Sequence, residues 1–228
     1  MTGPNVDAVF WDIGGVILAM ESVRESHRRF VTELVESHDS TLSTEEAVET
    51  WRSELGAYFA ETEGTDYRPA REGYRRAVDA ILPAGTDDVD WQSLLRESAV
   101  ESIRANPGAV ETIEHLDDSG VTLGVISDVD EDEGRHILAT LGVLDAFETV
   151  TTSEAVGRKK PDPLLFETAL SVTGVDPADA AFVGDRYSHD MRGGRDAGMT
   201  TIAYGAEDGP AVDYRIDHLS EILDIVGV

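Results

Sequence analysis

The spacing of apolar residues changes twice along the chain. Residues 6–11 form a short apolar run of β-forming residues that ends at Asp12, and a Gly-Gly pair marks a sharp turn directly after it. Apolar residues then recur at helical spacing from about residue 21 to residue 104, which predicts helices throughout that stretch. From residue 105 onward, short apolar runs alternate with helical segments, so a different architecture is expected there.

Turn-forming residues divide the long helical stretch. Ser43-Thr44-Glu45-Glu46 has the form of a capping box, which indicates the start of a helix. Further helices are predicted over residues 70–82 and 91–103. Loops rich in Gly, Pro, Thr and Asp separate these helices at residues 64–66 and 83–88.

The second part of the chain alternates strands and helices. Strands are predicted at residues 121–126, 147–150, 180–183 and 200–204. Helices are predicted at residues 106–120, 136–141, 163–173 and 189–197. Apolar strands alternating with helices favour a Rossmann-like, doubly wound parallel α/β sheet. We therefore predict an α/β core of residues 1–20 and 105–228, with residues 21–104 inserted as an all-helical cap domain.

The charge balance is strongly acidic. The chain has 46 Asp and Glu against 18 Lys and Arg, and its formal net charge is −28. Only two of the cations are lysines, the adjacent Lys159 and Lys160. Acid excess, scarce lysine and no cysteine are together typical of proteins from organisms with a salt-rich cytoplasm, where a Debye length of about 3 Å screens self-repulsion. We therefore predict a halophilic protein.

The composition also excludes several classes of function. Without cysteine there is no disulfide framework and no thiolate chemistry. No apolar run is long enough to span a bilayer, and the chain does not open with a basic segment followed by an apolar one, so a cytoplasmic protein without a membrane partner is expected. Nucleic acid is not an expected partner because there is no basic patch to neutralise phosphates.

Polar residues follow the predicted strands at the sheet edge where parallel sheets bind ligands. They are Asp12 after the first strand, Ser127 and Asp128 after the second, Lys160 before the strand at 180–183, and Asp185 and Asp190 after it. A single Asp or Ser after a strand is typical of a helix N-cap. All of them together at one edge favour an active site.

The residue types at this edge suit phosphoryl transfer. An aspartate can attack phosphorus, and clustered carboxylates suit Mg²⁺, which prefers oxygen ligands. A serine hydroxyl and backbone N–H groups can hold phosphoryl oxygens, while a lysine neutralises developing negative charge. A lysine kept in a chain with only two indicates a need for a compact ammonium group, so Lys160 is the first candidate.

Four segments resemble the four motifs of the haloacid dehalogenase-like superfamily, in that family's order. They are Asp12–Val16, Val125–Asp128, Lys160–Pro163 and Gly184–Asp190. The resemblance covers residues 5–20 and 105–228, and the inserted helices are similar to the family's C1-type cap. It implies an Mg²⁺-dependent phosphatase that acts on a small phosphorylated substrate through an aspartyl-phosphate.

The same resemblance implies a role for each residue at the site. Asp12 would be the nucleophile and a metal ligand, and the backbone carbonyl of Gly14 and the carboxylate of Asp185 would complete the Mg²⁺ ligands. Asp190 would orient water molecules or the lysine. The remaining three residues would bind the phosphoryl group, through the hydroxyl of Ser127, the backbone N–H of Asp128 and the ammonium of Lys160.

Position 14 departs from the family pattern. Phosphatases of this family usually carry a second aspartate there, as acid and base, and general acid–base catalysis is typically worth about 10²–10⁴-fold. Three alternatives stay open: a phosphatase that borrows another group or uses a good leaving group, a 2-haloacid dehalogenase-type hydrolase, or a non-catalytic phosphate-binding protein. Candidates for a borrowed acid–base group are Glu21, His27, Asp128 and Asp130.

Two basic features of the helical insert are also candidates for substrate contact. Arg24, His27, Arg28 and Arg29 form a cluster that either faces an anionic substrate or makes ion pairs with neighbouring glutamates. Arg68 lies in a predicted loop of the kind that, by resemblance, reaches into the site.

Overall fold

The computed structural model describes residues 6–82 and 89–228, so the predicted loop at 83–88 lies outside the described residues. The chain forms two compact units. One contains the residues up to Ala19 together with Arg104–Val228, and the other contains Met20–Ile103. The first unit holds the sheet and the second is helical.

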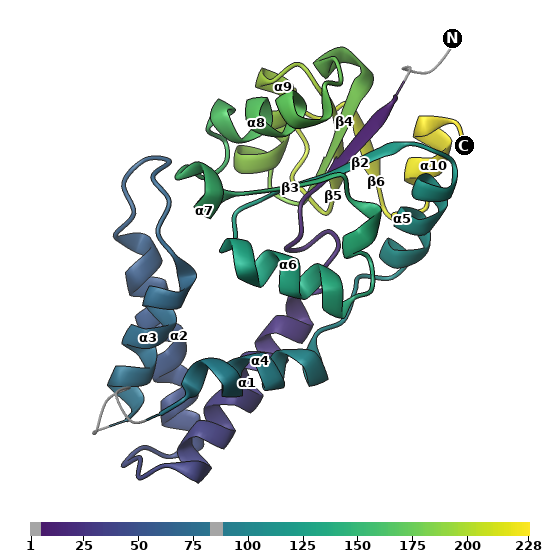
Figure 1. The fold of residues 1–228 in the computed structure, drawn as a ribbon. Coiled ribbons are helices and arrows are strands. Elements are labelled where there is room, and N and C mark those ends of the chain that lie inside the picture. The colour runs from purple at the N-terminus through teal and green to yellow at the C-terminus, as the bar shows by residue number, and fades with distance from the viewer. Residues whose placement is uncertain (1–5, 83–88) are drawn as a thin grey trace. The chain divides into compact units, whose positions relative to one another are not determined.

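A parallel sheet of six strands, in the order β3-β2-β1-β4-β5-β6, forms the centre of the first unit (Figure 1). The strands are β1 Ala8–Trp11, β2 Thr122–Ser127, β3 Thr149–Thr152, β4 Ala180–Gly184, β5 Thr200–Tyr204 and β6 Tyr214–Ile216. The strand order reverses between β1 and β4, which is where open α/β sheets bind ligands. The predicted Rossmann-like α/β fold is confirmed.

The register of the central strands places the polar residues of the sheet edge at one level. Trp11, the last residue of β1, pairs with Val125 of β2 and with Val183 of β4. Asp12 therefore emerges beside the ends of both neighbouring strands. All four residues of β1 are buried, because strands between parallel neighbours are covered on both faces.

Helices cover both faces of the sheet (Figure 1). Helices α8 and α9 lie on one face, and α5, α6 and α10 lie on the other. Their bounds are α5 Ala109–Asp118, α6 Glu131–Thr140, α8 Pro163–Thr173, α9 Arg192–Asp196 and α10 Glu221–Val226. Short turns complete the unit: η1 Leu144–Ala146, α7 Ser153–Val156, η2 Pro177–Asp179 and the π-helical η3 Tyr187–Met191. Buried Phe166 of α8 packs edge-on against Phe182 of β4, which fixes α8 on the sheet.

Several element boundaries differ from those predicted. Helix α6 begins at Glu131 rather than at residue 136, because the carboxylate of Glu154 accepts a 2.8 Å hydrogen bond from the backbone N–H of Glu131 and caps the helix from another part of the chain. Strand β3 begins at residue 149 rather than 147. Strand β6 and helix α10 were not predicted, since three and six residues are too few to show a clear period.

The described residues of the second unit form four helices: α1 Met20–Ser37, α2 Thr44–Ala60, α3 Ala70–Ile81 and α4 Trp91–Ser102. The predicted capping box at the start of α2 is confirmed, because the side chain of Ser43 and the side chain of Glu46 each accept from the other's backbone N–H. A core around Phe30, Leu34 and Trp51 joins these helices. Within the described ranges, every helix is too short or too polar to cross a membrane.

Candidate active site

Lys160 lies at the centre of a buried charged cluster. Its side chain is 0% exposed, and its Nζ lies 2.9 Å from Oδ2 of Asp12 and 2.7 Å from Oδ1 of Asp190. The same Nζ donates a 3.3 Å hydrogen bond to the backbone carbonyl of Ile126. The ammonium group is thus held between two carboxylates from different segments of the chain.

Asp12 is held through both of its carboxylate oxygens. Oδ1 accepts hydrogen bonds from the hydroxyl of Ser127 at 2.7 Å and from the backbone N–H of Ile13 at 2.8 Å. Oδ2 faces Lys160. Because the end of β1 lies beside the end of β2, the sheet itself brings Asp12 and Ser127 together.

Asp190 lies on the π-helical turn η3 and ties that turn to the end of β4. Its Oδ2 accepts hydrogen bonds from the backbone N–H of Asp185 at 3.1 Å and of Arg186 at 2.8 Å. Its other oxygen pairs with Lys160. Asp190 therefore positions both the lysine and the backbone that carries Asp185.

Asp12, Asp185 and Asp190 form a cluster in which one carboxylate oxygen from each lies within 4.8 Å of the others. Oδ1 of Asp185 is buried and has no hydrogen-bond partner among the described residues. No hydrogen bond from those residues ends on the carbonyl oxygen of Gly14 either. These oxygens are free acceptors beside a concentration of negative charge, and they fit a hard cation.

The electrostatics of the cluster follow from burial and crowding. Burial raises the pKa of Asp12, and the ammonium of Lys160 only partly offsets it. Burial and the neighbouring carboxylates of Asp12 and Asp190 raise the pKa of Asp185 to about 6. Burial also acts on Asp190, but Lys160 and the backbone donors outweigh it, so its pKa is lowered. Burial alone would lower the pKa of Lys160, yet the two aspartates raise it, so the ammonium stays protonated.

The turn after Asp12 requires glycine at position 15. Gly15 has φ +82°, and a Cβ at this position would lie 2.0 Å from Oδ2 of Asp185. The side-chain amide of Asn106 donates to the carbonyls of Gly15 at 2.8 Å and of Val16 at 2.9 Å, which fixes the turn. The close approach of backbone to carboxylate places Gly14 next to the acidic cluster.

Comparison with known proteins shows the family of this chain. Residues 6–198 match the family model of haloacid dehalogenase-like hydrolases. The chain belongs to the haloacid dehalogenase-like hydrolase family. A similar curated protein is glyceraldehyde 3-phosphate phosphatase of Methanopyrus kandleri, 32% identical over 133 residues. That alignment covers 54% of this chain and 57% of the relative, so the chain spans little more than half the length of the relative.

Solved structures in this family resemble the whole chain. A structure described as an HAD phosphatase from Thermococcus onnurineus has a TM-score of 0.75 and 27% identity, and the match covers 97% of this chain and 98% of that one. A 2-haloacid dehalogenase from Pseudomonas syringae pv. Tomato has a TM-score of 0.72 and 25% identity, with the same coverage. Similar structures are thus described both as a phosphatase and as a 2-haloacid dehalogenase.

Asp128 has contacts that the sequence did not reveal. Its Oδ1 accepts hydrogen bonds from the hydroxyl of Ser153 at 2.7 Å and from the backbone N–H of Lys160 at 2.8 Å. Its Oδ2 pairs with Nη2 of Arg186 at 2.9 Å. The sequence pattern does not single out Ser153 or Arg186, although Arg186 directly follows Asp185. With both oxygens engaged, Asp128 joins the segments that carry Ser153, Lys160 and Arg186.

Arg68 and Arg29, two basic residues predicted as candidates for substrate contact, form ion pairs within the helical unit. Arg68 lies 3.0 Å from Oε2 of Glu61, donates to the carbonyl of Tyr58 at 2.8 Å and stacks over the ring of Tyr58 at 4.0 Å. Arg29 forms an ion pair with Glu101. Their charges are thus already balanced by neighbouring groups.

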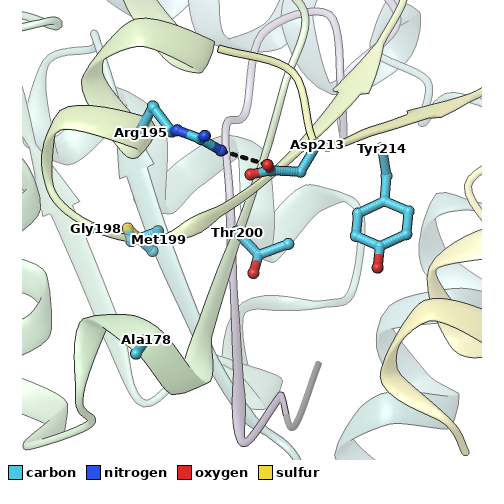
Figure 2. A pocket seen from close by; sticks show the side chains of 7 residues that line it. All are labelled: Ala178, Arg195, Gly198, Met199, Thr200, Asp213 and Tyr214. Atoms are coloured by element: carbon cyan, nitrogen blue, oxygen red, sulfur yellow. Dashed lines mark hydrogen bonds and ion pairs between the residues drawn. The ribbon is translucent and has the colours of Figure 1, made fainter. Parts of the chain in front are cut away.

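A hollow of about 540 Å³ lies at the opposite edge of the sheet, where β5 and β6 begin (Figure 2). Its lining includes Arg195 and Asp213, which form an ion pair with each other. Thr200 and Tyr214, the first residues of the two strands, complete this side of it. The lining of the hollow contains none of the predicted site residues.

Proposed function

We propose that this protein is an Mg²⁺-dependent phosphatase that hydrolyses a small phosphorylated metabolite through a phosphoryl group carried on Asp12. The observation that carries the proposal is the way the Asp12 carboxylate is held. Ser127 and the backbone of Ile13 fix one oxygen, and buried Lys160 fixes the other. The family membership and the phosphatases among its relatives support the same reaction.

The proposed metal ligands are the carboxylates of Asp12 and Asp185 and the carbonyl of Gly14. Three carboxylates and one ammonium give the cluster a formal charge of −2, which would repel a phosphate dianion. Bound Mg²⁺ would neutralise this charge and polarise the phosphoryl oxygens. The buried, unpartnered Oδ1 of Asp185 supports this assignment.

In the first step, a carboxylate oxygen of Asp12 forms a bond to phosphorus while the bond from phosphorus to the leaving-group oxygen breaks. The leaving oxygen takes the electron pair and then a proton from solvent water. Ser127 and the backbone N–H of Asp128 would hold the transferred phosphoryl oxygens, and protonated Lys160 would balance their charge.

In the second step, a water oxygen attacks phosphorus and the bond to Asp12 breaks. Water loses a proton to solvent, phosphate leaves, and Asp12 regains its carboxylate. Lys160 keeps its proton throughout, because its two aspartate partners hold the pKa high. Asp190 acts through Lys160 and through the backbone of Asp185 rather than on the substrate.

Gly14 offers no side chain to protonate the leaving group or to activate water. Substrates whose leaving group is stable as an anion are therefore favoured, such as acyl phosphates or phosphoesters of acidic alcohols. For alkyl phosphates of ordinary alcohols, the missing acid–base group should slow turnover by roughly 10²–10⁴-fold.

A 2-haloacid dehalogenase is the second candidate, because the structurally similar protein from Pseudomonas syringae pv. Tomato is described as one and because Gly14 removes the phosphatase acid. In that reaction a carboxylate oxygen of Asp12 would displace halide from carbon, and water would then hydrolyse the ester. The acidic cluster around Asp185 favours the phosphatase, since a metal-free displacement has no need of a third carboxylate.

The deciding experiment measures phosphate release from 4-nitrophenyl phosphate and halide release from 2-chloropropionate, with Mg²⁺ and with EDTA. The phosphatase proposal expects phosphate release only with Mg²⁺, and a loss of at least about a thousandfold in Asp12→Asn. Chloride release that is indifferent to EDTA would establish the dehalogenase instead. Phosphate binding with no turnover of either compound would show a non-catalytic protein.

A further inference from the structure

The helical unit contains a small pocket between α1 and α2 with a volume of about 230 Å³. Arg24, His27 and Arg28 of α1 and Arg52 of α2 line it, together with Trp51 and Leu55. The lining contains no carboxylate, although acids outnumber bases 46 to 18 in the chain. A concentration of positive charge of this kind runs against the composition of the whole protein.

The three arginines of this pocket have no ion-pair partner within residues 6–82 and 89–228. Other arginines of the same unit do have partners: Arg75 pairs with Asp79 at 3.1 Å, and Arg76 pairs with Glu54 at 2.9 Å. Arg24 and Arg28 therefore do not form the ion pairs with neighbouring glutamates that the sequence allowed. Their guanidinium groups are exposed and available to an external anion.

The apolar wall of the pocket is a buried, ring-packed tryptophan that carries an unsatisfied donor. Trp51 is 2% exposed, stacks on Tyr74 with ring centroids 5.4 Å apart, and meets the ring of His27 edge-on at 5.3 Å. The indole Nε1–H of Trp51 is buried and has no acceptor among the described residues. Burial lowers the pKa of His27 to about 4, so the positive charge at neutral pH comes from the arginines alone.

We propose that this pocket binds a small organic anion that has a compact apolar body. Guanidinium groups pair with planar carboxylate or phosphate oxygens, often through two parallel hydrogen bonds. The side chains of Trp51 and Leu55 would cover the apolar body. A volume of 230 Å³ is below the ~300–1,000 Å³ of ordinary ligand pockets, which limits the ligand to about one ring or a short chain. This inference assigns a site to the helical unit and is independent of the chemistry at Asp12.

Calorimetric titration of the full chain in EDTA tests the proposal with three probes. Phenylacetate carries both the anion and the apolar body, acetate carries only the anion, and benzyl alcohol carries only the apolar body. Phenylacetate should bind most tightly, and Arg28→Gln and Arg52→Gln should each weaken it about tenfold. Equal binding of phenylacetate and benzyl alcohol, or none of either, would overturn the proposal.

Arg96→Gln is the matched control. Arg96 is an exposed arginine of α4 whose side chain forms no ion pair or hydrogen bond with another described residue, and it does not line the pocket. The substitution Arg96→Gln removes the same charge, and phenylacetate affinity should stay within about twofold of that of the unaltered protein. An equal loss of phenylacetate affinity in Arg96→Gln and Arg52→Gln would mean that the affinity depends on net charge alone. That result would overturn the proposed binding site. Circular dichroism of each variant confirms that its helices are intact.

Asp12→Asn separates this site from the proposed active site. Phenylacetate binding should be unchanged in Asp12→Asn, whereas phosphatase activity should be lost. Binding that disappears in that variant would place phenylacetate in the core and would refute the pocket without touching the phosphatase proposal. Repeating the titrations with phenylphosphonate shows whether the arginines prefer a phosphoryl or a carboxyl group.

Discussion

The ammonium of Lys160 lies 2.9 Å from the carboxylate of Asp12, and both side chains are shielded from solvent. A buried ion pair is strong only if its geometry is good and its remaining polar atoms are satisfied. Both conditions hold here, because Asp190 and the carbonyl of Ile126 take up the other donors of Lys160. The pair therefore joins Asp12, the proposed nucleophile, to the cation that balances its negative charge.

Lys160→Arg should lower kcat for an aryl phosphate by at least about tenfold, because a planar guanidinium does not fit a site built for a compact ammonium. Lys160→Met should also destabilise the fold by roughly 3–5 kcal/mol, since Asp12 and Asp190 would be left buried without a counter-charge. Steady-state kinetics and urea unfolding measure the two effects. Lys159→Arg is the control and should behave like the unaltered protein; near-normal rates in Lys160→Arg would refute the point-charge argument.

Gly15→Ala should be damaging beyond the cost of its backbone angle. The substitution places a Cβ 2.0 Å from the carboxylate of Asp185 at φ +82°. Gly142→Ala is a matched control, because Gly142 has φ +77° but no atom within 4 Å of the added Cβ. Thermal unfolding should show about 1–2 kcal/mol lost in the control and more in Gly15→Ala. Activity should fall only in Gly15→Ala, and equal activity in the two variants would contradict the role of this turn.

How much of the site follows from sequence depends on what places each residue. Asp12 and Ser127 end neighbouring strands, so their meeting follows once a parallel sheet is predicted. Lys160 was found through its rarity in the chain. The three loops held by Asp128 were not predictable, because the hydrogen bonds to Ser153 and Arg186 depend on backbone paths across 25 and 58 residues. Hydrophobic periodicity carries no information about such paths.

The same limit applies to the fold. Long apolar runs such as Val121–Ile126 gave reliable strands, because burial on both faces leaves a continuous signal. Helix α6 was predicted too short, since its first turn is acidic and is capped by the distant Glu154. Strand β6 has only three residues and was missed. The bounds of α6 failed because a distant residue caps it, and β6 was missed because it is short.

His27 should make the fold less stable as the pH falls. Its folded pKa of about 4 is below the ordinary value of 6.5, because burial beside Trp51 disfavours the imidazolium, and the arginines around it offer no negative charge in compensation. Between those two values the unfolded chain binds more protons than the folded chain. The stability is therefore present above pH 6.5 and is lost as the pH falls toward 4, by up to about 3 kcal/mol.

Urea unfolding of the protein and of His27→Gln at pH 7.5 and pH 5 measures this contribution. The carboxylates titrate in both proteins, so the difference between the two isolates His27. The unaltered protein should lose more stability than His27→Gln over this interval. Parallel losses would mean that His27 is protonated in the folded state at pH 5.

Salt should stabilise the protein, because a net charge of −28 causes self-repulsion that molar salt screens. The melting temperature should rise steadily between 0.1 M and 2 M KCl. Sorbitol at matched water activity is a control for non-ionic effects and should raise it less. A melting temperature independent of KCl would contradict the predicted halophilic character.

Asp128→Asn and Asp213→Asn form a pair that separates stability from activity. Each aspartate pairs with an arginine and accepts further hydrogen bonds, but Asp128 holds the backbone of Lys160 whereas Asp213 lies at the opposite sheet edge (Figure 2). Both variants should lose about 1–3 kcal/mol of stability, because each weakens charge-assisted hydrogen bonds. Only Asp128→Asn should also lower kcat, by roughly tenfold, since Lys160 would no longer be fixed against Asp12. Equal kcat values in the two variants would show that Asp128 is structural and nothing more.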